Sequence, residues 1–561
     1  MEPKVLIRRL AAAFVFSVFT VASAAAETSF WSSHEISNEE RAKSIAASMS
    51  NEELIGQVLM LGYLGAQPTE EFLEWVSEWG IGGVKVFGWN TGDLHRMAQG
   101  IAMMQDAAVN TNPGVPLFVA TDQEGGWVRH VKGNTTVTPG NMAIGASGIA
   151  FDAFTSGYLI GKELAILGIH MNFAPTVDVY TNPDAYVIGP RSFSSDPLET
   201  AFLSVAYYRG LEEAGIISTA KHFPGHGNTA ADSHGSLPVI NDTLAKIWDI
   251  DLLPYRMLIK EGLPAVMSGH LNFPLISGDS EPATLSPVLL KDILRDKMGF
   301  NGLVITDDMM MYGVRQGDRS LPRVCEMALR AGNNMIMISR PPEVQSEVRN
   351  YLLDLLNADP GFKTTVSESV ERIIRTKLIY LKPHGKTGLY PDVDRIDELP
   401  DSDGKGFVFD LACRSTTLIK NTAIPIDTVN SQRVLLVGDY PDFISEGKAK
   451  YTFAETFSVG SHPISNTKLR DFIDTAADFE TIIVCLADEE NLETLKKLHP
   501  LEKKIAVLSV LNPVYLAETP WVKTAVAVYG TGTESFRAGF AVLAGDFAAT
   551  GNLPISLPGV R

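Results

Sequence analysis

The stretch ISTAKHFPG, residues 217–225, begins with apolar and small residues and ends in Lys221 and His222 before a proline and a glycine. A short run of this kind, bounded by turn-forming residues, is typical of a strand in a parallel sheet. Seven more such runs precede or follow it: GQVLMLGY (56–63), GGVKVFG (82–88), LFVATDQEGG (117–126), HMNFAPTVDV (170–179), AVMSGHL (265–271), GLVITDD (302–308) and NMIMISR (334–340). Segments with helical periodicity, such as 68–79 and 321–332, separate them. Eight β/α units predict a (β/α)8 barrel of the TIM type, with a doubly wound open sheet as the second interpretation.

Polar side chains collect where these apolar runs end. They are Asp122, Glu124, Asp178, Lys221, His222, His270, Asp307 and Asp308. The carboxyl ends of the strands of a barrel meet at one rim, where active sites lie. Loop polarity accounts for one or two such residues, but it accounts poorly for acids, bases and cations after five neighbouring strands. We therefore expect the active site at this rim.

The rest of the chain predicts a second domain. We expect the barrel over residues 35–385 and a linker rich in Pro, Gly and Asp over 386–404. Beyond the linker, buried strands are predicted in RVLLVGD (433–439), TIIVCLA (481–487), KKIAVLSVL (503–511) and TAVAVYG (524–530). Helical segments alternate with them, which favours an α/β sandwich over residues 405–561. This part has no phosphate-cradling glycine fingerprint, so the sequence argues against a nucleotide site.

Composition and the N-terminus restrict the partners and the location. The 561 residues carry a formal net charge of −19, which argues against nucleic acid or an anionic membrane surface as a partner. A basic start, an apolar stretch and small residues near Ala26 predict a signal peptide over residues 1–26. A retained anchor is the alternative. We therefore expect an exported protein, periplasmic or secreted, with no membrane contact once the signal is cleaved.

The loop after the fifth run, KHFPGHGNTAADSH (221–234), holds three histidines, and three interpretations compete. A zinc site through His222, His226 and His234 is one, and a loop held only by histidine–backbone hydrogen bonds is another. The third is acid/base chemistry, in which Asp232 binds one nitrogen of His234 and leaves the other free to exchange a proton. Of the adjacent acids Asp307 and Asp308, one should face the site, because successive strand residues point to opposite faces. An acid together with a carboxylate nucleophile is the equipment of a retaining glycosidase.

Five motifs in this order resemble the family 3 glycoside hydrolases, and in particular their β-N-acetylglucosaminidase branch. The motifs are DQEGG (122–126), NFAPTVDV (172–179), IGPRSF (188–193), KHFPGHGNTAADSH (221–234) and VITDD (304–308). ACRSTTLIKN (412–421) and the closing GNLPISLPG (551–559) resemble the C-terminal domain of the same family. The resemblance therefore covers nearly the whole chain after the predicted signal peptide.

The resemblance implies roles for residues at matching positions. Asp307 matches the nucleophile, and His234 matches the general acid/base with Asp232 as its orienting partner. The residues that match the sugar-binding positions are Asp122, Arg191, Lys221 and His222. The family has an arginine eight residues after the first acid of DQEGG, where this chain has His130 preceded by Arg129. Either residue could contact the sugar.

The function expected from the resemblance is that of an exo-acting, retaining β-N-acetylglucosaminidase that needs no metal or other cofactor. Cell-wall (peptidoglycan) fragments with a terminal N-acetylglucosamine are the favoured substrates, and chito-oligosaccharides come next. A neutral histidine acid leaves room for an anionic acceptor, so a phosphorylase stays open. A family 3 β-glucosidase and a non-catalytic protein that binds wall glycans stay open as well.

Overall fold

Eight parallel strands close into a barrel in the computed structural model, which describes residues 36–111, 113–315, 317–339, 341–381, 387–429, 433–460 and 464–557. The strands follow the order β10-β1-β2-β3-β6-β7-β8-β9, and an isolated bridge between Ile305 and Met335 joins the two ends. Their bounds are β1 Leu59–Gly62, β2 Gly83–Val86, β3 Phe118–Thr121, β6 Met171–Asn172, β7 Ile217–Phe223, β8 Ala265–Ser268, β9 Leu303–Thr306 and β10 Ile336–Ile338. Every one of the eight predicted runs contains one of these strands. The predicted barrel is confirmed, while the predicted signal peptide lies outside the described residues.

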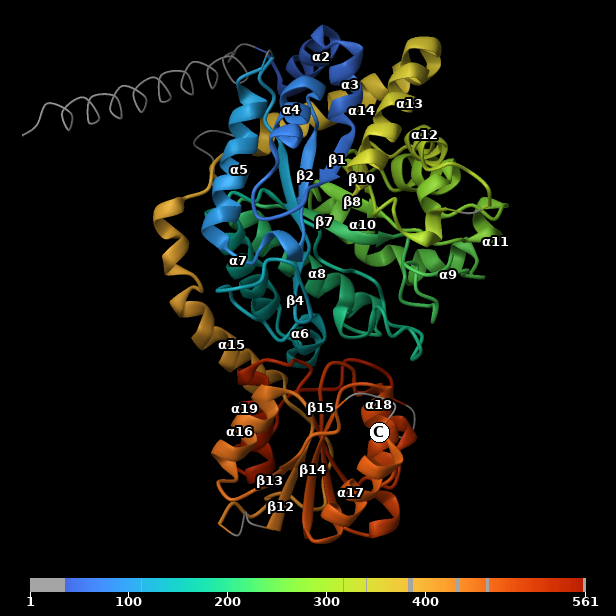
Figure 1. The fold of residues 1–561 in the computed structure, drawn as a ribbon. Coiled ribbons are helices and arrows are strands. Elements are labelled where there is room, and N and C mark those ends of the chain that lie inside the picture. The colour runs from blue at the N-terminus through green and yellow to red at the C-terminus, as the bar shows by residue number, and fades with distance from the viewer. Residues whose placement is uncertain are drawn as a thin grey trace, which may run out of the picture.

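Helices surround the barrel (Figure 1). They are α2 Asn38–Ser48, α3 Asn51–Gln57, α4 Glu70–Trp79, α5 Leu94–Val109, α6 Asn141–Ser147, α7 Ala150–Ile166, α8 Pro197–Glu213, α9 Leu244–Asp249, α10 Leu252–Lys260, α11 Pro274–Ser277, the π-helical η4 Val288–Lys297, α12 Leu321–Ala331, α13 Pro342–Ala358 and α14 Pro360–Tyr380. Several begin at a side chain that accepts a backbone N–H, and Ser37 and Ser50 each form a capping box with a glutamate three residues on. The strands are buried on both faces because side chains fill the barrel inside and helices cover it outside.

A small hairpin follows β3 that the sequence did not predict. It pairs β4 (Gln123–Gly125) with β5 (Val128–Arg129), and Gly125 and Gly126 both have positive φ at its turn. A Cβ on Gly126 would lie 3.1 Å from the Cα of Gly140, so the second glycine of the DQEGG motif allows a close approach of two backbone segments. The hairpin thus fixes the acids Asp122 and Glu124 on both sides of Gln123.

The second domain is a six-stranded sheet between two layers of helices. Its order is β11-β16-β15-β14-β12-β13, in which only β11 is antiparallel to its neighbour. The strands are β11 Thr417–Lys420, β12 Val434–Val437, β13 Glu455–Phe457, β14 Thr481–Leu486, β15 Lys504–Ser509 and β16 Thr524–Ala527. The helices are α15 Ser402–Ser415, α16 Pro441–Lys450, α17 Asn466–Ala477, α18 Glu489–Lys496 and α19 Thr533–Ala544. The four predicted strands are present, whereas β11 and β13 at the sheet edges were not predicted.

The strand ends that carry the rim face the second domain, and α15 runs along the side of the barrel down to it (Figure 1). After α14, the described part of the predicted linker, 387–404, lies against the barrel, buries Leu389, Ile396 and Leu399, and ends within the first turn of α15. The free cysteines Cys325 and Cys485 are buried, and Cys413 is half-buried. Within the described ranges, no helix combines the length and the apolar character that crossing a bilayer requires.

Candidate active site

Lys221, at the end of β7, lies at the centre of the rim. Its ammonium contacts Asp122 and, at 2.6 Å, Glu124, and its side chain is only 3% exposed. Burial alone would lower the pKa of this lysine, but the two carboxylates raise it above its usual value. The ammonium therefore stays charged inside the barrel mouth and joins the third and fifth strands electrostatically.

Asp122 and Glu124 reach Lys221 together because they stand two residues apart in an extended segment. The Gln123 between them points the other way, and its amide binds both the N–H and the carbonyl of Val131. Asn172 of β6 holds the backbone N–H and carbonyl of Gln123, each at 2.9 Å. Burial would raise the pKa of Asp122, but the two neighbouring lysines hold it well below its usual value. Burial would also raise the pKa of Glu124, but Arg191 and Lys221 lower it to about 2, so both acids are ionised.

Arg191 and His222 extend this arrangement on one side. Arg191 binds Glu124 with two parallel hydrogen bonds of 2.8 and 2.9 Å, and it also donates to Nε2 of His222 at 3.1 Å. Since a guanidinium can only donate, Nε2 of His222 is an acceptor and Nδ1 carries the hydrogen. That Nδ1 faces a carboxylate oxygen of Asp178 at 2.8 Å. Asp178 also accepts the backbone N–H of His226, so it fixes both the tautomer of His222 and the start of the histidine loop.

Lys85, in the middle of β2, extends the arrangement on the other side. Its ammonium contacts the second oxygen of Asp122, lies 3.3 Å from Nδ1 of His130 and sits 4.1 Å above the ring of Phe87. Burial, followed by the nearby Lys85, lowers the pKa of His130 to about 4, so its imidazole is neutral and accepts. We did not predict Lys85, although a lone lysine inside an apolar strand is itself a signal, because lysine is almost never buried without a partner.

The structure separates the two candidates Arg129 and His130. His130 lies beside Asp122 and Lys85, whereas the neighbouring residue Arg129 turns to the other face of β5. The charge that acts on Arg129 is Glu163 of α7, and burial lowers the pKa of Arg129. His130, and not Arg129, therefore lies at this edge of the site.

The residues described so far form one connected set of hydrogen bonds and ion pairs. We call this set the charged chain, and its members in order are Asp178, His222, Arg191, Glu124, Lys221, Asp122, Lys85 and His130.

Asp307 follows β9 and stands beside the charged chain. Burial would raise the pKa of its carboxyl, but His222, His270, the N–H of Asp308 and Lys221 together lower it below its usual value. Asp308 turns away, and its Oδ1 accepts the backbone N–H groups of Met310 and Ser339 at 3.1 and 3.2 Å. The two acids therefore differ: one is an ionised carboxylate at the rim, and the other holds the loop together.

His270, which the sequence left without a role, is buried behind Asp307. Its Nε2 faces the carbonyl oxygen of Asp308 at 3.1 Å and must carry the hydrogen, because a carbonyl only accepts. Nδ1 then accepts from the hydroxyl of Thr284 at 2.8 Å. Burial lowers the pKa of this imidazole, so a neutral ring supports the turn that presents Asp307.

His234 and Asp232 form a pair on the histidine loop. Asp232 accepts both the backbone N–H and the Nδ1 hydrogen of His234, at 2.9 and 2.8 Å, which leaves Nε2 of His234 to face outward. The two side chains are 69% and 46% exposed. The loop reaches the strand-end segment after Asp307 through backbone bonds from Tyr312 to the carbonyl of His234 and from Gly313 to that of Ser233. The imidazole of His234 is thereby held on the loop that adjoins the nucleophile candidate.

The geometry does not favour the zinc interpretation of the loop. His222 is bonded to Asp178 and Arg191, His226 is buried with its ring centroid 5.8 Å from that of His222, and His234 is exposed. Among the residues that the structure describes, no group of three or more His, Cys, Asp or Glu side chains is arranged to hold a metal ion. The three histidines thus have three different environments.

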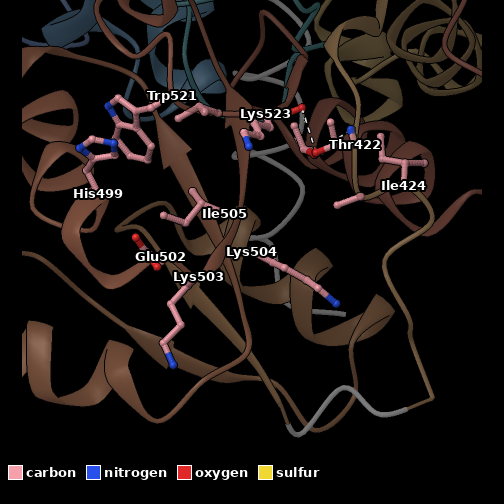
Figure 2. Close-up of a pocket in the computed structure, with 12 residues that line it drawn as sticks. Thr422, Ile424, His499, Glu502, Lys503, Lys504, Ile505, Trp521 and Lys523 are labelled. Carbon is pink, nitrogen blue, oxygen red and sulfur yellow. Dashed lines mark hydrogen bonds between the residues drawn. The ribbon is translucent and has the colours of Figure 1, made fainter.

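A cavity of about 700 Å³ lies elsewhere, at the amino ends of β15 and β16 in the second domain. Figure 2 shows His499 beside Trp521, with Lys503, Lys504 and Lys523 around the opening. Asp307, Lys221 and His234 are not among its lining residues. This cavity is therefore separate from the rim site.

Comparison with known proteins gives the family. A sequence profile described as Glycosyl hydrolase family 3 N terminal domain matches residues 50–376, more than half of the chain. The chain belongs to glycosyl hydrolase family 3. This confirms the family predicted from the five motifs, and with it the class of glycoside hydrolases. The nucleophile candidate Asp307, which follows the seventh barrel strand, lies within the residues that the family profile matches.

Three relatives of this family 3 chain are informative. Beta-hexosaminidase A of Pseudoalteromonas piscicida is 34% identical over 329 residues, which are 55% of this chain and 55% of that protein. Beta-hexosaminidase of Thiobacillus denitrificans is 34% identical over 296 residues, 52% of this chain and 80% of that protein. The solved structure of a glycoside hydrolase family 3 beta-N-acetylglucosaminidase from Paenibacillus sp. str. FPU-7 has a TM-score of 0.82 and 27% identity, and the match covers 91% of this chain and 99% of that one. The chain thus spans about half the length of the first relative and nearly all of the third.

The charged chain predicts a role for Lys85 that can be measured. Lys85→Met keeps the length of the side chain but leaves one oxygen of Asp122 without its cation. Because hydrogen bonds to charged groups contribute about 1.5–3 kcal/mol, kcat/KM on an aryl glycoside should fall roughly 10- to 100-fold, mainly through KM. Lys132→Met, at an exposed lysine of the neighbouring loop, is the matched control and should stay within twofold of the wild type. Equal losses in the two variants would contradict the role of Lys85.

Asp251, between α9 and α10, predicts how stability depends on pH. The carboxyl is buried behind Gly225, its Oδ1 has no hydrogen-bond partner in the described structure, and burial together with Asp178 and Asp242 raises its pKa to about 7. The folded protein keeps this proton up to about pH 7, whereas an unfolded aspartate loses it near pH 4. Its stabilising contribution is therefore full below about pH 4 and is lost as pH rises through 7.

Asp251→Asn should accordingly melt at a higher temperature than the wild type at pH 8, and the difference should shrink toward pH 5. Differential scanning fluorimetry across this range measures it. Asp249→Asn makes the same charge change at an exposed position and should give no such pH dependence. A difference for Asp251→Asn that stays constant or grows toward low pH would show that the carboxyl is not protonated in the folded state.

Proposed function

We propose that the protein is an exo-acting β-N-acetylglucosaminidase that hydrolyses terminal N-acetylglucosamine from cell-wall fragments with retention of configuration. The observation that carries this proposal is the ionised Asp307 beside the charged chain, with the His234–Asp232 pair on the adjoining loop. The names of the relatives, beta-hexosaminidase and beta-N-acetylglucosaminidase, support the choice of sugar. Chito-oligosaccharides are the second class of substrate.

In the proposed mechanism, a carboxylate oxygen of Asp307 attacks the anomeric carbon while Nε2–H of His234 protonates the departing glycosidic oxygen. Asp232 stabilises the imidazolium and holds its tautomer. A water molecule then gives a proton to His234 and attacks the anomeric carbon of the glycosyl ester. This step frees the carboxylate of Asp307 and releases the sugar with its original anomeric configuration. The backbone hydrogen bonds from Tyr312 and Gly313 to the histidine loop hold His234 near the segment that follows Asp307, which supports this pairing.

The charged chain supplies the sugar-binding groups. The ammonium of Lys221 has three hydrogens, and Asp122 and Glu124 take two of them, so the third is available to a sugar hydroxyl. Each carboxylate oxygen of Asp122 accepts more than one hydrogen bond, which leaves lone pairs for hydroxyl donors. Because the residues of the charged chain are already bonded to one another, their polar groups are oriented before the substrate arrives. In the proposed complex, Arg191 and His222 contact the acetamide side of the sugar.

Hydrolysis is tested with a panel of aryl glycosides, each measured with and without inorganic phosphate and with a chelator. We expect release from the N-acetyl-β-glucosaminide, little from the β-glucoside, and no effect of the chelator. A rate increase with phosphate and a sugar 1-phosphate product would make the enzyme a phosphorylase. Sugar binding without release would make it a wall-glycan-binding protein.

The basic residues, the apolar stretch and the small residues near Ala26 at the N-terminus support export of the protein. Cell fractionation, with N-terminal sequencing of the chain that is recovered, tests this part of the proposal.

The different environments of Asp307 and Asp308 predict which acid is the nucleophile. Asp307→Ala should lose several orders of magnitude in kcat, because no covalent intermediate can form. Asp308→Asn keeps an oxygen that accepts the N–H groups of Met310 and Ser339, so it should lose less than about tenfold. A slow fluorinated N-acetylglucosamine derivative should leave its mass on the peptide that contains Asp307. If no carboxylate is labelled and Asp308→Asn is as damaging as Asp307→Ala, the acetamide of the substrate is the nucleophile instead.

The exposed His234 predicts a dependence on the leaving group. His234→Ala should lose most activity on glycosides with poor leaving groups, roughly 100-fold or more, because they need protonation to depart. Activated aryl leaving groups should lose less in the first step. Asp232→Ala should give a milder form of the same pattern, since it removes only the orientation of the imidazole. Equal losses over the whole series of leaving groups would assign the acid to another residue.

A further inference from the structure

The loop from Tyr180 to Ser195 lies between the site and the second domain. Its last turn, η2 (Gly189–Arg191), presents Arg191 to Glu124 and His222. Apolar residues of this loop, including Tyr180 and Ile188, pack in one cluster with Tyr529 and Ile555 of the second domain. The loop that carries a member of the charged chain is therefore an interdomain element.

Two side chains of the second domain hold the first part of the loop. The amide of Asn512 donates to the hydroxyl of Tyr180 at 2.8 Å, and that hydroxyl donates to the carbonyl of Pro183 at 2.6 Å. The same amide nitrogen lies close to Gly189, where an added Cβ would be 3.4 Å away. Tyr515, three residues after Asn512, stacks its ring on Tyr186 with centroids 5.7 Å apart and planes within 4°.

The end of the loop is held by the closing segment of the described chain. The carbonyl of Pro554 accepts the backbone N–H of Ser195 at 3.0 Å and the hydroxyl of Ser194 at 2.8 Å. Asn141 of α6, a barrel helix that packs against α15, donates to the carbonyl of Arg191 at 2.7 Å. Both ends of the loop thus depend on residues of the second domain.

The loop also reaches inward to the histidine loop. The carbonyl of Gly227 accepts the backbone N–H groups of Thr181 and Asn182, at 3.2 and 3.1 Å. A Cβ on Gly227 would lie 1.9 Å from the carbonyl oxygen of Val179, so the two loops meet without room for a side chain. A displacement of the Tyr180 end would therefore move the segment that leads to His234 as well as Arg191.

We propose that the second domain is a positioning part of the active site, and that Asn512 and Tyr515 are its positioning residues. They hold the loop 180–195 so that Arg191 bonds Glu124 and His222, and so that the histidine loop keeps its start. Neither residue needs to touch the sugar. This assigns to the second domain a function that goes beyond the proposed hydrolysis and that applies to whatever glycoside the rim accepts.

The test compares variants of the full chain. Asn512→Ser retains an oxygen that can cap the turn Pro513–Glu518, but it is too short to reach Tyr180. Tyr515→Ala removes the stacked ring, and Tyr515→Phe keeps it. Because displacements of about 1 Å at a catalytic group can cost 100-fold, the double variant Asn512→Ser/Tyr515→Ala should lose at least roughly tenfold in kcat/KM, while Tyr515→Phe stays at the wild-type value. Trp521→Ala, at the cavity of Figure 2, is the control that weakens the second domain away from this loop.

Coupling separates positioning from a general loss of stability. In an Arg191→Lys background, the double change should cost much less than it does in the wild type, because the contact that it positions is already impaired. Full additivity, an unchanged kcat/KM in the double variant, or an equal loss in Trp521→Ala would each overturn the proposal.

Hydrogen exchange gives a readout that does not depend on the substrate. The double variant should exchange faster than the wild type in peptides covering 180–195 and 221–236, and Trp521→Ala should not. If the wild type failed to cleave any aryl glycoside while this exchange pattern held, the proposed hydrolysis would fall and the positioning role would stand. Unchanged exchange in both peptides would overturn the positioning role whatever the activity.

Discussion

The buried ammonium of Lys221 between Asp122 and Glu124 is the contact on which the rest of the site depends. A charge removed from water is costly, and it is kept inside a protein only where opposite charges and hydrogen bonds compensate it. Here the compensation comes from the third strand and its hairpin, while the lysine comes from the fifth. Each carboxylate then needs its own second cation, which Lys85 and Arg191 provide. The alternation of signs therefore dictates that β2, β3, β7 and the loop before α8 meet at one place.

The neutral histidines follow from the same constraint. The cations Lys85, Lys221 and Arg191 already lie among the acids Asp122, Glu124, Asp178 and Asp307, and the buried histidines add no further charge to this set. Burial lowers the pKa of His130 and of His226 to about 4, and it lowers that of His270, so these rings serve as uncharged donors and acceptors. The one imidazole that the proposed mechanism requires to change its charge, His234, lies on the exposed loop, where water can solvate both forms. The buried histidines thus hold the site in shape, and the exposed one is the ring to which the proposed mechanism assigns proton transfer.

The barrel and most of the rim could be predicted because both follow from local rules. Apolar runs bounded by glycine and proline indicated the eight strands, and the ends of those runs indicated Asp122, Lys221, His222 and Asp307. Lys85 escaped because it lies in the middle of a run, where the search for polar strand ends does not look. The choice between Arg129 and His130 depended on the hairpin β4–β5, whose register is fixed by Gln123 and Asn172 from different parts of the chain. The edge strands β11 and β13 were missed for a similar reason, since they are short and only partly buried, so their sequences lack a strong apolar pattern.

The proposed positioning role would make a second domain necessary to a barrel that carries all the charged groups itself. The relative from Thiobacillus denitrificans is matched over 80% of its length by 52% of this chain, so the remainder of that protein is too short for a domain like residues 405–561. In this chain the loop directs hydrogen-bonding groups to Asn512 and Pro554, which lie more than 300 residues later in the sequence. Since a loop without such partners samples many conformations, ordering it through the second domain lowers the entropy lost when the sugar binds. In the proposed positioning role, the loop 180–195 couples the interface between the domains to the charged chain.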